Sequence, residues 1–301
     1  MYQKVLSSLV LCTALLFAAW VHAQPSDPTK WKLANSANLI DITVEALKEW
    51  KELGIDYVEV GHTTFPDPRM PMEEMIERAK NVKAKLDEAG VGVWSIHITF
   101  SRHLDISQFD EAGRQATIDF FSRKIRLAPY LGFKHAVIHP GAEPIRDEDR
   151  PARIAHSRAS LAILNKVAQE HNVRLAVENL PRTAMGNTAE EILKILDGLD
   201  DTIGICFDVN HPLQEKPEEF VARIGRSDRR ITTVHMADYD FIDERHWIPG
   251  DRRGVIDWVK VVNALSEVGY EGPFLFESAG TPAEKVEAWR TILRKVVESR
   301  N

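Results

Sequence analysis

Seven segments that read as β-strands end in a carboxylate or a histidine, and these residue types could bind a divalent metal together. In chain order they are Glu59, His97, His139, Glu178, Asp208, His235 and Glu277. Side chains alternate along a strand, and each polar residue has the parity opposite to the apolar positions that would face a layer of helices. If the strands are parallel and close into a barrel, the seven side chains point inward at one end.

Four of these residues come from successive strands and would be neighbours: Glu178, Asp208, His235 and Glu277. Several unpaired charges buried together are costly unless they are paired or bound to a metal. Carboxylate oxygens with one imidazole suit Mn²⁺, Mg²⁺, Co²⁺ or Zn²⁺. We therefore expect these four to bind one divalent metal. The alternative is purely structural pairing, in which each residue caps a helix or pairs with a loop arginine.

Two histidines in predicted loops form a second tier. His211 follows Asp208 by three residues, and His246 lies in the loop after the seventh strand. Either could bind a second metal or a polar substrate, and loop residues over a barrel mouth usually select ligands. The full substrate-binding or second-metal set is His97, His139, His211, His246 and Glu59. Cys206 faces inward one layer below and is expected in the core. Loop or surface positions without a role are expected for His62, His103, His135, His156 and His171.

The elements that would position these residues alternate strictly along the chain. The strands are predicted at Trp31–Ala34, Ile55–Val60, Val91–Ile98, His135–His139, Arg174–Glu178, Ile203–Asp208, Ile231–Met236 and Pro273–Glu277. The helices are predicted at Ile42–Leu53, Pro71–Ala89, Glu111–Leu131, Arg150–His171, Thr188–Leu199, Lys216–Ile224, Ile256–Val268 and Thr281–Ser299. Eight repeats predict an α/β fold, a single (β/α)₈ TIM barrel. An open doubly wound sheet would need a glycine-rich turn after its first strand, and residues 31–41 contain no glycine.

The amino terminus has the pattern of an export signal. Lys4 precedes an apolar run from Val5 to Trp20, and Val21-His22-Ala23 offers small residues at a cleavage site. We expect a signal peptide at 1–23, a barrel domain at 24–301 and a periplasmic or secreted protein. An uncleaved anchor is the alternative. After cleavage no stable membrane span is expected, and a formal net charge of −7 argues against nucleic acid as a partner. The sequence leaves homo-oligomerisation open.

Short segments at the strand ends resemble a known superfamily. They are Trp94–His97, Val137–Gly141, Ala176–Asn179, Phe207–His211, Val234–Asp238, the Pro249-Gly250…Ile256-Asp257-Trp258 stretch and Phe276–Ser278. In this order they resemble the xylose isomerase-like barrels, which include sugar (phosphate) isomerases and epimerases and the type IV apurinic endonucleases. The resemblance covers nearly all of residues 31–299.

The resemblance implies a carbohydrate enzyme. In the epimerase and isomerase members, the matches of the four expected ligands bind one divalent metal. The matches of Glu178 and Glu277 also act as acid and base on opposite faces of the sugar, through an enediolate. The leading hypothesis is therefore a metal-dependent isomerase or epimerase of a small-molecule carbohydrate, most simply a neutral sugar.

Three alternatives stay open. A lyase or hydratase of 3-keto-glycosides would share the first proton abstraction, with Arg252 and Arg253 holding the larger glycoside. An apurinic endonuclease would need three zinc ions, for which the usual Asp-x-His is replaced by Glu244-Arg245-His246. A sugar-binding barrel without catalysis is the third.

Overall fold

The barrel strands are the elements that carry the candidate site. The computed structural model describes residues 24–300, and within them the sheet has eight strands in the order β7-β6-β5-β4-β3-β2-β1-β8, with parallel neighbours. The strands are β1 Leu33–Ala37, β2 Ile55–Val60, β3 Gly92–His97, β4 His135–Ile138, β5 Arg174–Glu178, β6 Gly204–Asp208, β7 Ile231–His235 and β8 Phe274–Phe276. Met236, just after β7, bridges to Phe276 and donates its N–H to Leu275 O at 2.8 Å. The eight-stranded TIM barrel predicted from the sequence is confirmed.

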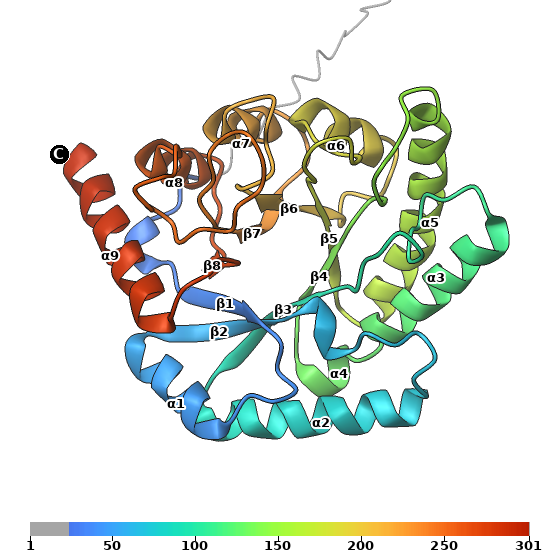
Figure 1. Cartoon of the computed structure of the whole chain (residues 1–301), viewed down its shortest axis with the longest axis horizontal. Helices are drawn as coiled ribbons and strands as arrows, with labels where there is room; N and C mark the ends of the chain where they lie inside the picture. The colour runs from blue at the N-terminus through green and yellow to red at the C-terminus, as the bar shows by residue number, and fades with distance from the viewer. Residues whose placement is uncertain (1–23, 301) are drawn as a thin grey trace, which may run out of the picture.

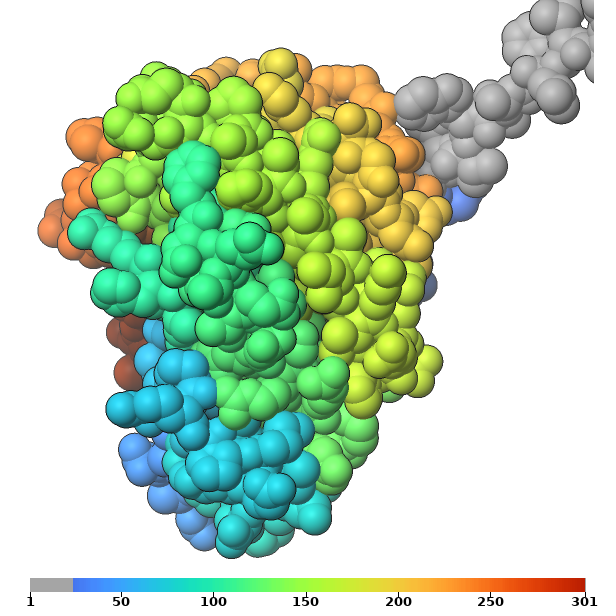
Figure 2. All heavy atoms as spheres, turned by 90° about the vertical axis from the view of Figure 1, so that its right-hand side faces the viewer, coloured from blue at the N-terminus to red at the C-terminus, as the bar shows by residue number. Residues whose placement is uncertain are grey.

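Helices surround the strands (Figure 1). They are α1 Val44–Leu53, α2 Met72–Ala89, α3 Glu111–Ile125, α4 Ala128–Leu131, α5 Arg150–Glu170, α6 Ala189–Leu196, α7 Pro217–Gly225, α8 Trp258–Glu267 and α9 Pro282–Ser299, with 3₁₀ turns η1 Pro28–Lys30 and η2 His62–Thr64. On one side of the molecule, α2, α3 and α5 form the outer surface, coloured from cyan to yellow-green in Figure 2. The prediction of a single helix over 111–131 is wrong, because this segment forms two helices, α3 and α4. Pro129 has no N–H to donate to Ile125 O, so the hydrogen-bond ladder of α3 cannot continue through this point, and Pro129 instead lies in the first turn of α4.

Local signals explain where the helices begin and end. Thr281 accepts from the N–H of Glu284, whose side chain in turn accepts from the N–H of Thr281, so that α9 begins with a complete capping box. At the other end of a helix, Gly54 follows α1 with φ +106°, a left-handed conformation that closes the last turn. These caps fix the ends of the helices and so the loops that lead to the strands.

Small side chains and one tryptophan fill part of the barrel interior below the site. Val137, Ala176 and Cys206 are fully buried and contact one another, which confirms the expected place of Cys206 in the core. The β2–β3 register skips Trp94, and its indole N–H donates to the Thr233 hydroxyl at 3.1 Å. This bulge lets Trp94 reach the seventh strand, which strict alternation did not predict.

His135 was predicted to lie in a loop or at the surface, and this prediction is wrong. It is the first residue of β4 and half-buried, with its ring centroid 4.6 Å from that of Trp94. Burial lowers the pKa of His135 to about 4.

The expected signal peptide lies outside the described residues. Within residues 24–300, no helix has the length and apolar character needed to cross a membrane.

Candidate metal and substrate site

Four consecutive strands bring the four expected ligands together. Glu178, Asp208 and His235 are the last residues of β5, β6 and β7, and Glu277 follows β8 directly. One potential ligand atom of each lies within 4.8 Å of the others. Three of the side chains are buried, and that of Glu277 is 23% exposed. The arrangement follows from chain alternation, because parallel strands end at the same rim of the barrel.

His235 is the centre of this group. Its Nδ1 lies 2.8 Å from Glu277 Oε2, 3.2 Å from Glu178 Oε1 and 3.7 Å from Asp208 Oδ2. Its Nε2 faces Glu59, a fully buried carboxylate that also accepts a hydrogen bond from the Ser95 hydroxyl at 2.7 Å. Glu59 therefore holds the back of the imidazole and leaves Nδ1 toward the three acidic side chains.

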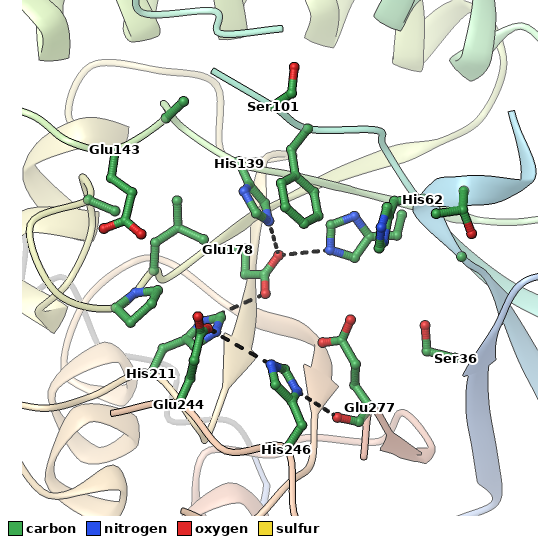
Figure 3. Close-up of a pocket in the computed structure, with 18 of the residues that line it drawn as sticks. Ser36, His62, Ser101, His139, Glu143, Glu178, His211, Glu244, His246 and Glu277 are labelled. Atoms are coloured by element: carbon green, nitrogen blue, oxygen red, sulfur yellow. Dashed lines mark hydrogen bonds and ion pairs between the residues drawn. The ribbon is translucent and has the colours of Figure 1, made fainter. Parts of the chain in front are cut away.

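A second group shares Glu178. His97 Nε2 and His139 Nε2 lie 3.2 Å and 3.1 Å from Glu178 Oε2, and Figure 3 shows His139 and the carboxylate pointing toward each other. His97 is the last residue of β3 and His139 follows β4. These two histidines, predicted to contact substrate or a second metal, thus lie beside the four-ligand group.

A third group lies in the loops over the barrel. Its members are His211, Glu244 and His246, and Glu244 Oε2 lies 3.1 Å from His211 Nε2 and 3.9 Å from His246 Nε2 (Figure 3). Glu244 was not assigned a role from the sequence. The available signal was its place in Glu-x-His, where the family pattern has Asp-x-His.

Main-chain carbonyls orient three of the histidines. His97 Nδ1 lies 3.0 Å from Ile98 O, His211 Nδ1 lies 2.8 Å from Asn179 O, and His246 Nδ1 lies 2.9 Å from Glu277 O. A carbonyl only accepts, so each Nδ1 carries the proton. In the neutral ring, Nε2 then presents a lone pair to a carboxylate, which is the orientation of a metal ligand.

Three buried carboxylate oxygens have no hydrogen-bond partner of good geometry, although histidine nitrogens lie near them. They are Glu59 Oε1, Glu178 Oε2 and Asp208 Oδ2. Buried polar atoms are normally satisfied, and acidic oxygens facing imidazole lone pairs call for protons or cations between them. The donor set therefore fits divalent metal ions. The described residues of the four-ligand group would hold one, and the two histidine-rich groups could hold others.

Without a metal, the acidic side chains draw protons onto the histidines. Burial disfavours the charged ring, but Glu178 raises the pKa of His97 to about 8. Asp208 and Glu244 in the same way overcome burial and raise the pKa of His211 to about 9. Burial raises the pKa of the Glu277 carboxyl, yet His235 lowers it to a net value of about 2. The metal-free site is thus a network of imidazolium and carboxylate groups.

An arginine joins three loops around the third group. Arg182, after β5, contacts Glu143 after β4 and reaches Asp243 and Glu244 after β7 at 2.7 Å and 2.8 Å. Its backbone has φ +53°, which is unusual for a non-glycine residue. Arg182 binds Glu244 Oε1 and leaves Oε2 facing the two histidines.

A second tie comes from Asn210, which follows β6. Its side-chain oxygen accepts the backbone N–H of Arg245 at 3.0 Å. The loop that carries Glu244 and His246 is therefore anchored both to Arg182 and to the end of β6.

Members of all three groups line a cavity of about 690 Å³ at the carboxyl ends of the strands, although Asp208 and His235 are not among its lining residues. The residues that line the cavity without a role expected from the sequence include His62 in η2 and Phe100, whose ring centroid is 4.0 Å from that of His139. Arg252 and Arg253 are not among the lining residues. Arg253 instead packs over Trp247 and pairs with Asp251, so the hypothesis that these arginines hold a glycoside is wrong.

A known family model matches most of the chain. Residues 47–296 match the model described as the xylose isomerase-like TIM barrel. The chain belongs to this family. The resemblance drawn from the strand-end motifs is confirmed.

Relatives of this xylose isomerase-like barrel carry the names of several different functions. The present chain is 29% identical over 188 residues to an uncharacterized protein of Methanocaldococcus jannaschii, and the match covers 61% of this chain and 63% of the relative. A probable endonuclease 4 of Acholeplasma laidlawii is 24% identical over 48% of this chain and 49% of the relative. The chain thus spans less than two thirds of either protein. A ketose 3-epimerase of Arthrobacter globiformis is 25% identical over 77% of this chain and 76% of the enzyme.

Solved structures share the fold. A D-tagatose 3-epimerase-like protein has a TM-score of 0.76 at 24% identity, covering 90% of this chain and all of that one. The 3-keto-D-glucoside 4-epimerase of E. coli has a TM-score of 0.66 at 20% identity, covering 88% of this chain and all of that one.

Proposed function

We propose that the protein is a divalent-metal-dependent isomerase or epimerase of a carbohydrate. The observation that carries the proposal is a pair of glutamates that both contact one imidazole nitrogen. Glu178 Oε1 and Glu277 Oε2 lie 3.2 Å and 2.8 Å from His235 Nδ1, at the floor of the cavity. The similarity to a ketose 3-epimerase supports the same chemistry.

Each group has a stated part in this proposal. Glu178, Asp208, His235 and Glu277 hold the metal, which when bound supplies the Lewis acidity that weakens a C–H bond beside a substrate carbonyl. Glu178 and Glu277 remove and return the proton on opposite faces of the sugar.

The residues outside the four-ligand group position the substrate and the metal ligands. His211 and His246 bind sugar oxygens in a one-metal site, or a second metal. His97 and His139 orient Glu178, and Glu59 orients His235.

One combined experiment tests the proposal. Purified protein is analysed for bound metals and then incubated in D₂O with a panel of ketoses and keto-glycosides. A metal-dependent exchange of the C–H proton next to the carbonyl, with an isomerised product, is expected. Elimination products would instead indicate the lyase alternative, and binding without exchange would indicate a non-catalytic sugar-binding barrel.

A metal-dependent hydrolase is the second candidate, because two further ligand groups flank the four-ligand group. These are His97–His139–Glu178 and His211–Glu244–His246, and the relatives include a probable endonuclease 4. Three metal ions per chain together with cleavage of abasic duplex DNA would establish it. One metal per chain and no DNA cleavage would exclude it.

We also propose that residues 1–23 are a signal peptide and that the protein is exported. Amino-terminal sequencing of protein from the periplasm or medium should then begin at Gln24. Protein that begins at Met1 and stays in the cytoplasm would contradict this.

A further inference from the structure

The cavity extends away from the proposed reactive centre. The four-ligand group belongs to β5–β8, whereas much of the lining comes from loops after β1 to β4. Figure 3 shows this spread, with Ser36, Ser101 and Glu143 around the edges and Glu178 near the middle. A substrate ring held at Glu178 and Glu277 therefore leaves space beside it.

The volume is larger than one sugar ring requires. A hexose occupies on the order of 200 Å³, roughly the share of seven water molecules in the liquid. The cavity measures about 690 Å³. Even with metal ions and water in place, a second ring of the same size fits.

The wall beyond the centre has the chemistry of a sugar subsite. Phe100 lines this cavity and stacks on His139, with the rings of His62 and His97 nearby, and 39% of its surface is exposed. Leu104 and Leu180 extend the apolar wall, while Ser101 and Glu143 offer polar groups. An aromatic ring surface matches the C–H face of a pyranose, because its negative π-cloud meets weakly positive hydrogens. Hydroxyls at the ring edge then meet the polar groups.

We propose that the loops after β3 and β4 form a subsite for a second sugar ring, with Phe100 as the residue that selects it. The substrate is accordingly a glycoside with two rings rather than a free monosaccharide. This inference rests on the proposed function for its chemistry.

The inference restricts where the substrate carbonyl lies. A glycoside is locked as an acetal at its anomeric carbon, so it cannot open to expose a carbonyl there. Proton transfer by the glutamates then needs a ketone elsewhere on the ring. The reaction that supplies such a substrate is a dehydrogenation, in which a ring hydroxyl carbon gives a hydride to a hydride acceptor and the oxygen loses a proton.

The test compares substrates that differ only in the second ring. The metal-loaded protein is assayed in D₂O with 3-keto-cellobiose and with methyl 3-keto-β-D-glucoside, which carries a methyl group in place of the second ring. We expect kcat/KM for exchange to be at least roughly tenfold higher for the two-ring compound. In Phe100→Ala this ratio should fall by roughly threefold to tenfold, the usual worth of one aromatic contact. Phe100→Trp should retain it.

Two controls keep the outcomes distinct. Phe109→Ala removes a phenylalanine that is 52% exposed and does not line the cavity, and it should leave the ratio unchanged. A ratio near one in the wild type would overturn the subsite while leaving the proposed function intact. If neither ketone exchanges, the proposed function fails. The subsite is then decided by calorimetric binding of cellobiose against methyl β-D-glucoside, where equal affinity or a Phe100-independent difference overturns it.

Discussion

The Nε2 atom of His235 lies 3.1 Å and 3.2 Å from the two carboxylate oxygens of Glu59, and neither side chain is exposed. The carboxylate is itself held by the Ser95 hydroxyl. Glu59 thus fixes both the rotation and the tautomer of the imidazole. Glu59 contacts the proposed metal ligand His235 and not the metal itself, so removing the Glu59 charge should change metal binding through its effect on His235.

Glu59→Gln should therefore weaken metal binding. The amide keeps the size of the side chain but loses the charge that makes His235 a stronger ligand. We expect affinity for Mn²⁺ or Zn²⁺ to fall by about tenfold to a hundredfold, measured by competition with a chromophoric chelator. Glu49→Gln, an exposed position on α1, is the matched control. Unchanged affinity in Glu59→Gln would contradict the positioning role.

Glu178→Gln and Glu277→Gln should each abolish turnover while leaving a ligand oxygen in place. Loss of a general acid or base costs about 10²-fold to 10⁴-fold in rate. Isomerisation and C–H exchange are followed by NMR in D₂O, with metal content measured for each variant. Glu271→Gln, exposed before β8, is the control. Full turnover in either variant that retains its metal would refute the two-glutamate mechanism.

Metal stabilisation should grow with pH. The metal-free pKa values of about 8 for His97, 9 for His211 and 10 for His246 lie above the ordinary 6.5. Their protonation therefore stabilises the folded metal-free protein fully below about pH 6.5, and this is lost as pH rises through 8 to 10. A divalent metal bound to the neighbouring carboxylates repels the charge on these rings and so displaces those protons.

The measurement is the Tm with and without metal from pH 6 to 9. Burial lowers the pKa of Lys124 to about 7, which has the opposite pH dependence, but that lysine is shared by both forms and cancels in the difference. The gap between metal-loaded and metal-free Tm should widen steadily. A constant gap would show that the histidines do not exchange protons for metal.

Arg182→Ala should loosen the loop that carries Glu244 and His246. It removes pairings with carboxylates from two other loops. Amide hydrogen exchange over 240–247 should accelerate by about tenfold, since charge-assisted contacts of a partly exposed group are lost. Arg146→Ala, which removes an exposed ion pair with Asp149, should leave that segment unchanged. Equal exchange in both variants would show that Arg182 does not hold the loop.

The strands were predictable because alternation leaves a clear trace. Ile55–Val60 and Arg174–Glu178 match the predicted bounds at both ends, and the parity of their residues placed Glu59 and Glu178 inside the barrel. Each strand needs only its own neighbours in sequence for this argument. The ring of inward-facing polar residues could therefore be predicted from the sequence alone.

The loop residues of the site could not be predicted in this way, because loops have no regular alternation of side chains. Glu244 and Phe100 enter the cavity because of contacts with residues far away in sequence, such as Arg182 and His139. The bulge at Trp94 arises from the pairing of β3 with β2, so the local sequence around Trp94 does not predict it. The assignment of Arg253 to the substrate was wrong because Trp247 and Asp251, in its own loop, satisfy it.

The orientation of three histidines in this barrel depends on the main chain and not on neighbouring side chains. His97, His211 and His246 take their orientation from carbonyl groups, which every amino acid supplies alike. Drift in the neighbouring side chains therefore leaves the ring tautomers intact. Side chains around these histidines can therefore be substituted without changing which ring nitrogen faces the acidic groups, as long as the backbone that supplies the three carbonyls keeps its path.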